Sequence, residues 1–195
     1  MFKLTGKLIS SIFTLGLVIL LIGFFLIKKF TDSDSSFDKN EKSGSNFITV
    51  SRVVDGDTFE LETKERVRLL GIDTPEKYES KKLDRDAESS GMDKKTVKKL
   101  GQMASDYVKG FVEGKKVRLE RDPVNEDKDR YGRLLRYVYL EDGTCVNAKI
   151  IRDGYAQVYE SFPISKMDEF RKLQREAREN NRGLWGPIEG LKQFK

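Results

Sequence analysis

Two acid-rich segments, at residues 55–58 and 73–76, bracket a stretch with the pattern of two short β-strands. If the chain folds back near Glu65, the positions that pair add up to about 130. Asp57 and Asp73 then lie opposite one another on adjacent strands. Two carboxylates and a nearby backbone carbonyl are the oxygen ligands that a hard cation prefers. The spacing therefore requires these strands to be neighbours in one sheet and predicts a cation site at their end.

The sequence of 195 residues contains no histidine. This excludes Ser-His-Asp hydrolases, Cys-His proteases, imidazole zinc sites and nucleases that depend on a histidine base. Any catalysis must come from carboxylates, arginines, lysines, tyrosines or an oxygen-bound metal, which favours Ca²⁺ or Mg²⁺. The single cysteine, Cys145, cannot form an intrachain disulfide. The net charge of +5 fits a polyanionic partner and equally a solvated surface of mixed charge.

An uncharged run of 20 residues begins at Leu8 and ends at Ile27. As a helix it is about 30 Å long, enough to cross a bilayer. A cleaved signal peptide is the alternative, but the run is long and no good cleavage site follows it. We predict a transmembrane helix within residues 1–30 that anchors the protein in the cell membrane as a single-pass protein, with the folded domain outside the cell. Cleavage would instead give a secreted form.

Residues 31–46 are polar and predict a flexible tether, and the folded domain is expected at residues 47–187, followed by a tail at 188–195. Alternating apolar residues predict strands, and apolar residues at helical spacing predict helices. Residues 77–93 lack a period and are expected to form a long loop. We predict an α+β, mainly β fold, a five-stranded OB-fold barrel with about three packed helices, with an unclosed α+β sheet as the alternative. The predicted strands are 48–54, 58–61, 66–70, 117–120 and 134–140, and the predicted helices are 97–111, 146–152 and one opening at Ser165.

Asp57 shares the strand parity of Phe59 and Leu61, so its side chain is expected to point inward with these core residues. An inward carboxylate is costly unless a cation or a donor satisfies it, which favours a site. Ordinary turn chemistry at Asp55 and Gly56 is the alternative reading of the same residues.

Three segments in this order resemble the signature motifs of the staphylococcal nuclease (thermonuclease) family. They read VDGDT at 54–58, RVRLLGIDTPE at 66–76 and DRYGRL at 129–134, and GLW at 183–185 resembles the end of the family's last helix. The resemblance covers roughly residues 47–186. It implies an OB-fold enzyme that uses one Ca²⁺ ion to hydrolyse the phosphodiester bonds of DNA and RNA.

The resemblance also implies roles for individual residues. Asp57 and Asp73 match the calcium carboxylates, and Thr74 matches the residue that supplies a backbone carbonyl. Glu76 matches the residue usually assigned as the general base. The matching arginines and pocket residues are Arg68 and Arg133 as phosphate clamps, and Arg130 and Tyr131 near the nucleotide pocket.

The residues agree with this chemistry, because a cation and planar arginine forks stabilise the charge that a phosphodiester gains as water adds. We expect a monomer that acts on DNA and RNA, with single strands preferred. The alternative is a membrane-tethered nucleic-acid-binding module without catalysis. The pair of tyrosines expected to stack on the nucleotide is not present at 158–162, although Tyr159 and Phe162 lie there.

Overall fold

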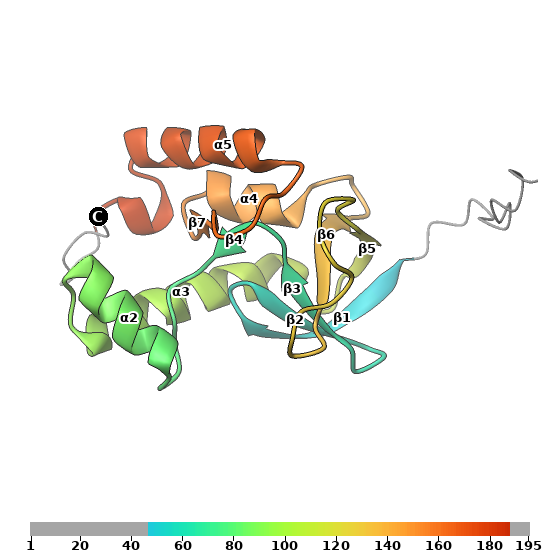
Figure 1. Cartoon of the computed structure of the whole chain (residues 1–195), viewed down its shortest axis with the longest axis horizontal. Coiled ribbons are helices and arrows are strands. Elements are labelled where there is room, and N and C mark those ends of the chain that lie inside the picture. Colours follow the sequence, from blue (N-terminus) through green and yellow to red (C-terminus); the bar gives the residue numbers. More distant parts are fainter. Residues whose placement is uncertain (1–46, 188–195) are drawn as a thin grey trace, which may run out of the picture. The chain divides into compact units, whose positions relative to one another are not determined.

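The structure is a computed structural model, and it describes residues 47–187. Five strands close into a barrel in the order β1-β2-β3-β6-β5 (Figure 1). Neighbouring strands are antiparallel except β3 and β6, which run parallel. The predicted five-stranded α+β barrel is confirmed, and the arrangement fits an OB-fold. The barrel strands are β1 (Ile48–Asp55), β2 (Thr58–Leu61), β3 (Arg66–Leu69), β5 (Lys116–Glu120) and β6 (Leu134–Leu140).

Alternate side chains of the strands fill the barrel. Phe59 and Leu61 of β2 and Val67 and Leu69 of β3 are buried, as a period of two requires. Asp57 continues this row and is only 6% exposed. Its predicted inward orientation is therefore confirmed, and it sits where the barrel core ends.

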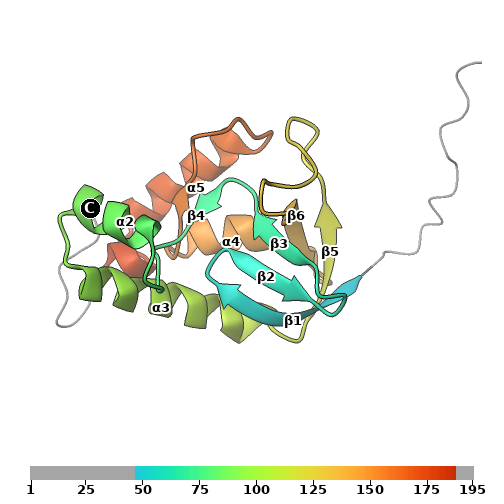
Figure 2. The ribbon, with the colours of Figure 1, turned by 60° about the horizontal axis from the view of Figure 1, so that its bottom comes forward.

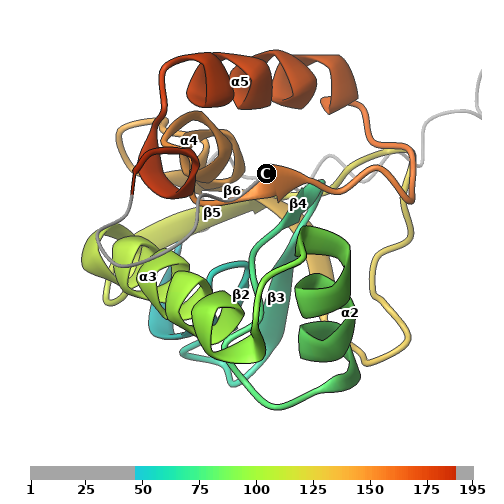
Figure 3. The same ribbon diagram turned by 90° about the vertical axis from the view of Figure 1, so that its left-hand side faces the viewer.

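Helices cover the barrel on two sides. The long α3 packs on β1, whereas α4 packs on β6 and carries α5 on its outer face (Figures 1 and 3). A two-stranded sheet of β4 (Ile72–Asp73) and β7 (Gln157–Val158) lies beside α5. The helices are α2 (Lys81–Ser90), α3 (Lys94–Val112), α4 (Val146–Arg152), α5 (Met167–Glu179) and the 3₁₀ turn η1 (Gly183–Trp185).

The described residues thus hold four α-helices rather than about three, because α2 replaces the loop predicted at 77–93. Ser80 caps α2 by accepting a hydrogen bond from the Leu83 amide, and Gly91 ends it with a φ of 65°. Figure 2 shows α2 beside the N-terminal half of α3. Leu83 is the only fully buried residue of α2 and packs with Val97 and Leu100 of α3. A single buried apolar residue gives no periodic pattern, so the sequence did not predict the helix.

The last helix begins at Met167, two residues after the predicted cap. The Ser165 hydroxyl and amide instead donate to the carboxylate of Asp122, which also accepts from Tyr137. Tertiary partners therefore outcompete the helix end for this side chain.

The predicted membrane helix, its orientation and the tether fall at residues outside 47–187 and stay predictions. Within the described part of the chain, every helix is too short or too polar to cross a membrane.

Candidate active site

Asp57 and Asp73 meet as predicted, but the predicted pairing between them is wrong. The β2–β3 ladder pairs Thr58 with Arg68 and Phe59 with Val67, so paired positions add up to 126 rather than 130. Asp57 lies opposite Leu69, whose amide donates to the Asp57 carbonyl over 2.9 Å. The chain folds back in a tight turn in which Lys64 takes a φ of 71°.

Asp73 reaches Asp57 by another route. Gly71, with a φ of 71°, turns the chain out of the barrel after β3. A Cβ atom there would lie 2.2 Å from the terminal methyl group of Ile164, and the positive φ is a conformation that favours glycine. The following strand β4 pairs with β7 and carries Asp73 back beside the end of β2.

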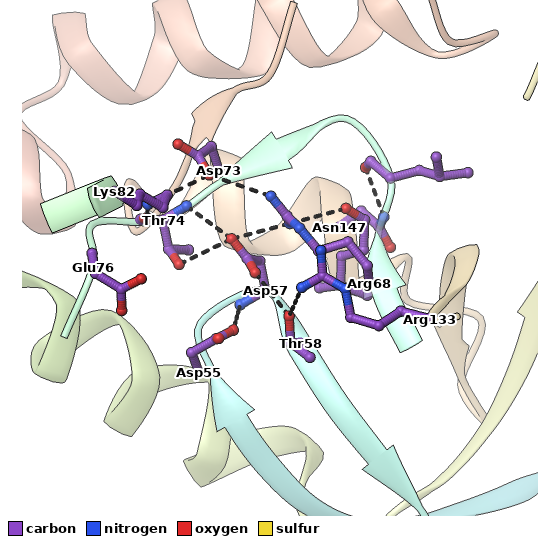
Figure 4. A network of polar contacts seen from close by, with 12 residues as sticks. Asp55, Asp57, Thr58, Arg68, Asp73, Thr74, Glu76, Lys82, Arg133 and Asn147 are labelled. Carbon is purple, nitrogen blue, oxygen red and sulfur yellow. Dashed lines mark hydrogen bonds and ion pairs between the residues drawn. The ribbon is translucent and has the colours of Figure 1, made fainter. Parts of the chain in front are cut away.

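Arg68 joins the two carboxylates (Figure 4). Its Nη1 lies 3.0 Å from Oδ2 of Asp57, and its Nη2 donates to Oδ1 of Asp73 over 3.3 Å. The amide and hydroxyl of Thr74 each donate to Oδ2 of Asp57 over 3.2 Å. The inward carboxylate is therefore satisfied by donors from two other segments.

A third carboxylate, from Asp55, belongs to the same cluster. Its Oδ1 accepts a hydrogen bond from the Asp57 amide over 3.1 Å. Burial and then the charge of Asp57 raise the pKa of Asp55 to about 7, and the same two causes raise the pKa of Asp73 to about 6. Burial opposes the charge of Asp57 too, but Arg68 and the hydrogen bond with Asp55 hold the pKa of Asp57 below its usual value. Negative charge is thus in excess here.

The donor set of Asp57, Asp73 and the Thr74 carbonyl fits Ca²⁺. These oxygens already hold two side-chain cations, since Arg68 contacts both carboxylates and Lys82 donates to the Thr74 carbonyl. Ca²⁺ prefers six to eight such oxygen ligands, and water or substrate can complete the set. Within residues 47–187 no three Asp, Glu, Cys or His side chains form a metal cluster.

Glu76 is not drawn into the cluster of carboxylates. Its Oε1 accepts from the amides of Lys77 and Tyr78 over 2.8 and 2.9 Å, and its Oε2 accepts from Ser80 over 3.3 Å. Figure 4 shows it apart from the Arg68 network. The segment that leads into α2 therefore orients this carboxylate.

Arg133, from the loop before β6, reaches the cluster through Thr58. Its Nη1 donates to the Thr58 hydroxyl over 3.4 Å, and this hydroxyl donates to Oδ1 of Asp57 over 3.1 Å (Figure 4). Asp129 accepts from Nε of Arg133 over 2.7 Å and fixes the direction of the side chain. Both predicted clamps thus approach Asp57, Arg68 directly and Arg133 through the Thr58 hydroxyl.

Arg130 and Tyr131 lie outside the cluster on the same loop as Arg133. Tyr131 is 68% exposed, and the guanidinium groups of Arg130 and Arg133 lie 4.8 and 5.5 Å from the centre of its ring. The ring borders an open hollow of about 500 Å³. The hollow is lined by Lys64, Glu65, Arg66, Tyr131, Gly132 and Arg133.

Sequence reasoning missed two members of the site and undervalued a third. Asp55 was interpreted as a turn residue, although two aspartates separated by one glycine can place both carboxylates in the same site. Lys82 and Asp86 lie on α2, and their spacing of four residues would have indicated a pair on one helix face had the helix been recognised.

Comparison with known proteins agrees with the motifs. The profile of the family described as "Staphylococcal nuclease homologue" matches residues 66–187. The chain is 34% identical over 182 residues to a thermonuclease of Staphylococcus intermedius, covering 88% of this chain and 96% of that protein. It is 36% identical over 139 residues to an uncharacterized endonuclease of Escherichia coli O157:H7, covering 70% and 74%.

The chain is also 32% identical over 153 residues to endonuclease YhcR of Bacillus subtilis, which covers 74% of this chain but only 12% of that much longer protein. The profile match and the full-length likeness to the Staphylococcus intermedius protein lead to one conclusion: the chain belongs to the staphylococcal nuclease family.

Proposed function

We propose that this chain is a nuclease that hydrolyses the phosphodiester bonds of DNA and RNA with the help of one Ca²⁺ ion. The observation that carries the proposal is the convergence of two arginine side chains on one buried carboxylate, Asp57. The relatives of this chain that are named thermonuclease and endonuclease support the same class of reaction.

Bound Ca²⁺ would supply positive charge that offsets the charge gained by the phosphate as water adds. Asp57, Asp73 and the carbonyl of Thr74 would hold it. Arg68 and Arg133 present planar guanidinium groups, which can donate two parallel hydrogen bonds to phosphate oxygens. Asp57 and Asp73 hold the guanidinium group of Arg68, and Asp129 holds that of Arg133, so both groups are oriented without substrate.

Glu76 would orient or deprotonate the attacking water. Three hydrogen bonds from Lys77, Tyr78 and Ser80 fix its carboxylate, which retains further acceptor positions for a water molecule. A carboxylate suits this role in a chain without histidine.

The proposal is tested by incubating the full-length protein with single-stranded DNA and single-stranded RNA in Ca²⁺ and in EGTA. We expect cleavage of both substrates in Ca²⁺, a fall to background in EGTA, and recovery when Ca²⁺ is restored. Cleavage that is insensitive to chelation would contradict the calcium requirement. Binding without turnover in Ca²⁺ would instead favour a nucleic-acid-binding module.

Tyr131 is proposed to stack on an unpaired base beside the clamps. Tyr131→Ala is expected to weaken binding of a short single-stranded oligonucleotide about tenfold, because stacking on an aromatic ring contributes about 1–3 kcal/mol per base. Fluorescence anisotropy in EGTA measures the affinity without cleavage. Tyr131→Phe keeps the ring and is expected to bind within about twofold of the wild type; equal losses in both variants would show that the ring does not stack.

A further inference from the structure

The ammonium group of Lys82 contacts two of the oxygen atoms that we propose as ligands of Ca²⁺. Its Nζ donates to the carbonyl of Thr74 over 2.6 Å and lies 3.6 Å from Oδ1 of Asp73 (Figure 4). Lys82 therefore engages two of the three donors in that set, while Arg68 engages Asp57 and Asp73.

The position of Lys82 is imposed by α2. Asp86, one turn further along the helix, accepts from Nζ of Lys82 over 3.0 Å. The same Asp86 oxygen accepts from the amide of Glu76 over 3.2 Å, which ties the helix to the segment that leaves β4. The Ser80 cap and buried Leu83 fasten this helix, so the ammonium group is held at the site by structure rather than by chance contact.

We infer that Lys82 is a resident counter-cation of the site, which competes with Ca²⁺ for the Thr74 carbonyl and Asp73 and so sets the calcium affinity. The inference rests on the proposed function. Lysine suits the role, because its ammonium is a point charge on a flexible stem that can swing aside, whereas the Arg68 fork is fixed by two carboxylates.

Charge explains why a counter-cation is useful here. Four carboxylates, from Asp55, Asp57, Asp73 and Asp86, surround two side-chain cations, Arg68 and Lys82. Without Lys82 the cluster gains one net negative charge, and like charges this close repel strongly in a partly buried site. Lys82 would therefore stabilise the calcium-free protein and lower its affinity for the ion, two effects with one cause.

A purely structural ion pair predicts a different result. If Lys82 only positions Thr74 and Asp73 for the ion, its removal loosens the donors and weakens calcium binding. The direction of the affinity change thus separates competition from support.

The test measures Ca²⁺ binding to the full-length protein by titration calorimetry, after chelation and removal of the chelator. Lys82→Met keeps the stem and removes the charge, and we expect its Kd for Ca²⁺ to be about tenfold lower than that of the wild type. Lys81→Met is the matched control, because Lys81 is exposed on the same helix and its substitution removes the same charge. Its Kd is expected to stay within about twofold of the wild-type value.

Thermal unfolding provides a second measurement. In EGTA, Lys82→Met should unfold at a lower temperature than Lys81→Met, and saturating Ca²⁺ should raise its Tm by more. Lys82→Gln, which keeps a hydrogen-bond donor but no charge, serves if the methionine variant does not fold, and its Kd should also fall.

An unchanged or higher Kd in a folded Lys82 variant would overturn the inference while leaving the proposed calcium-dependent reaction standing. A wild-type protein that binds no Ca²⁺ would overturn both. An equal fall in the Kd for Ca²⁺ in the Lys82 and Lys81 variants would show that only the net charge of the protein matters. That result would also overturn the inference.

Discussion

Replacing Arg68 by lysine is expected to slow the cleavage of single-stranded DNA about 100-fold or more at saturating Ca²⁺. Lysine keeps the positive charge between Asp57 and Asp73 but has no planar fork. Loss of one well-placed donor to the charge that develops in a transition state typically slows a reaction by about 10²- to 10³-fold. Single-turnover kinetics report the chemical step and exclude product release.

Arg175→Lys is the matched control, because Arg175 is exposed on α5, outside the described cluster. This variant should retain the wild-type rate. Circular dichroism should show both variants folded, since the charge beside the two aspartates remains. An Arg68→Lys protein with more than about a tenth of the wild-type rate would show that Arg68 acts as a charge alone.

The barrel was predictable because its strands carry their own signals. The buried residues of β2 and β3 alternate with polar ones in the sequence, which is the pattern of a strand with one buried face. The buried residues are Phe59, Leu61, Val67 and Leu69. The helix α2 was not predictable in this way. Its burial depends on Leu83 meeting residues of α3, which is a tertiary contact that a local pattern does not contain.

The structure brings together side chains that the motifs named, but in a register that the sequence did not predict. The motifs identified Asp57, Asp73, Arg68 and Arg133, and the structure brings all four together. The register was wrong because Lys64 adopts a left-handed conformation, which lysine rarely does, and shortens the turn. The contribution of α2 to the site, through Lys82 and Asp86, was missed with the helix itself.

Asn substitutions at Asp57 and at Asp55 are expected to change stability in opposite directions, although only one residue separates the two positions. In EGTA at pH 8, Asp57→Asn should lower the free energy of unfolding by about 2 kcal/mol, since it leaves donors of Arg68 and Thr74 without their charged acceptor. Asp55→Asn should raise that free energy by about 1–2 kcal/mol, since it removes a charge that the fold disfavours. Under the proposed function, hydrolysis by Asp57→Asn should also fall to background, because the proposed calcium site loses a carboxylate.

The pH dependence of these differences follows from the two pKa shifts. Folding raises the pKa of Asp55 to about 7, so the folded protein holds this proton more tightly than the unfolded chain does. The wild type therefore loses stability from this group as the pH rises from about 4 to about 7, so the advantage of Asp55→Asn should be smaller at pH 5 than at pH 8 and should vanish below about pH 4. Folding lowers the pKa of Asp57, so its stabilising charge is present above about pH 4 and is lost on further acidification. Urea unfolding of the wild type and both variants at pH 5 and pH 8 measures the changes in the free energy of unfolding. If both variants change this free energy in the same direction at pH 8, Asp55 is not the destabilising charge or Asp57 is not the stabilising one.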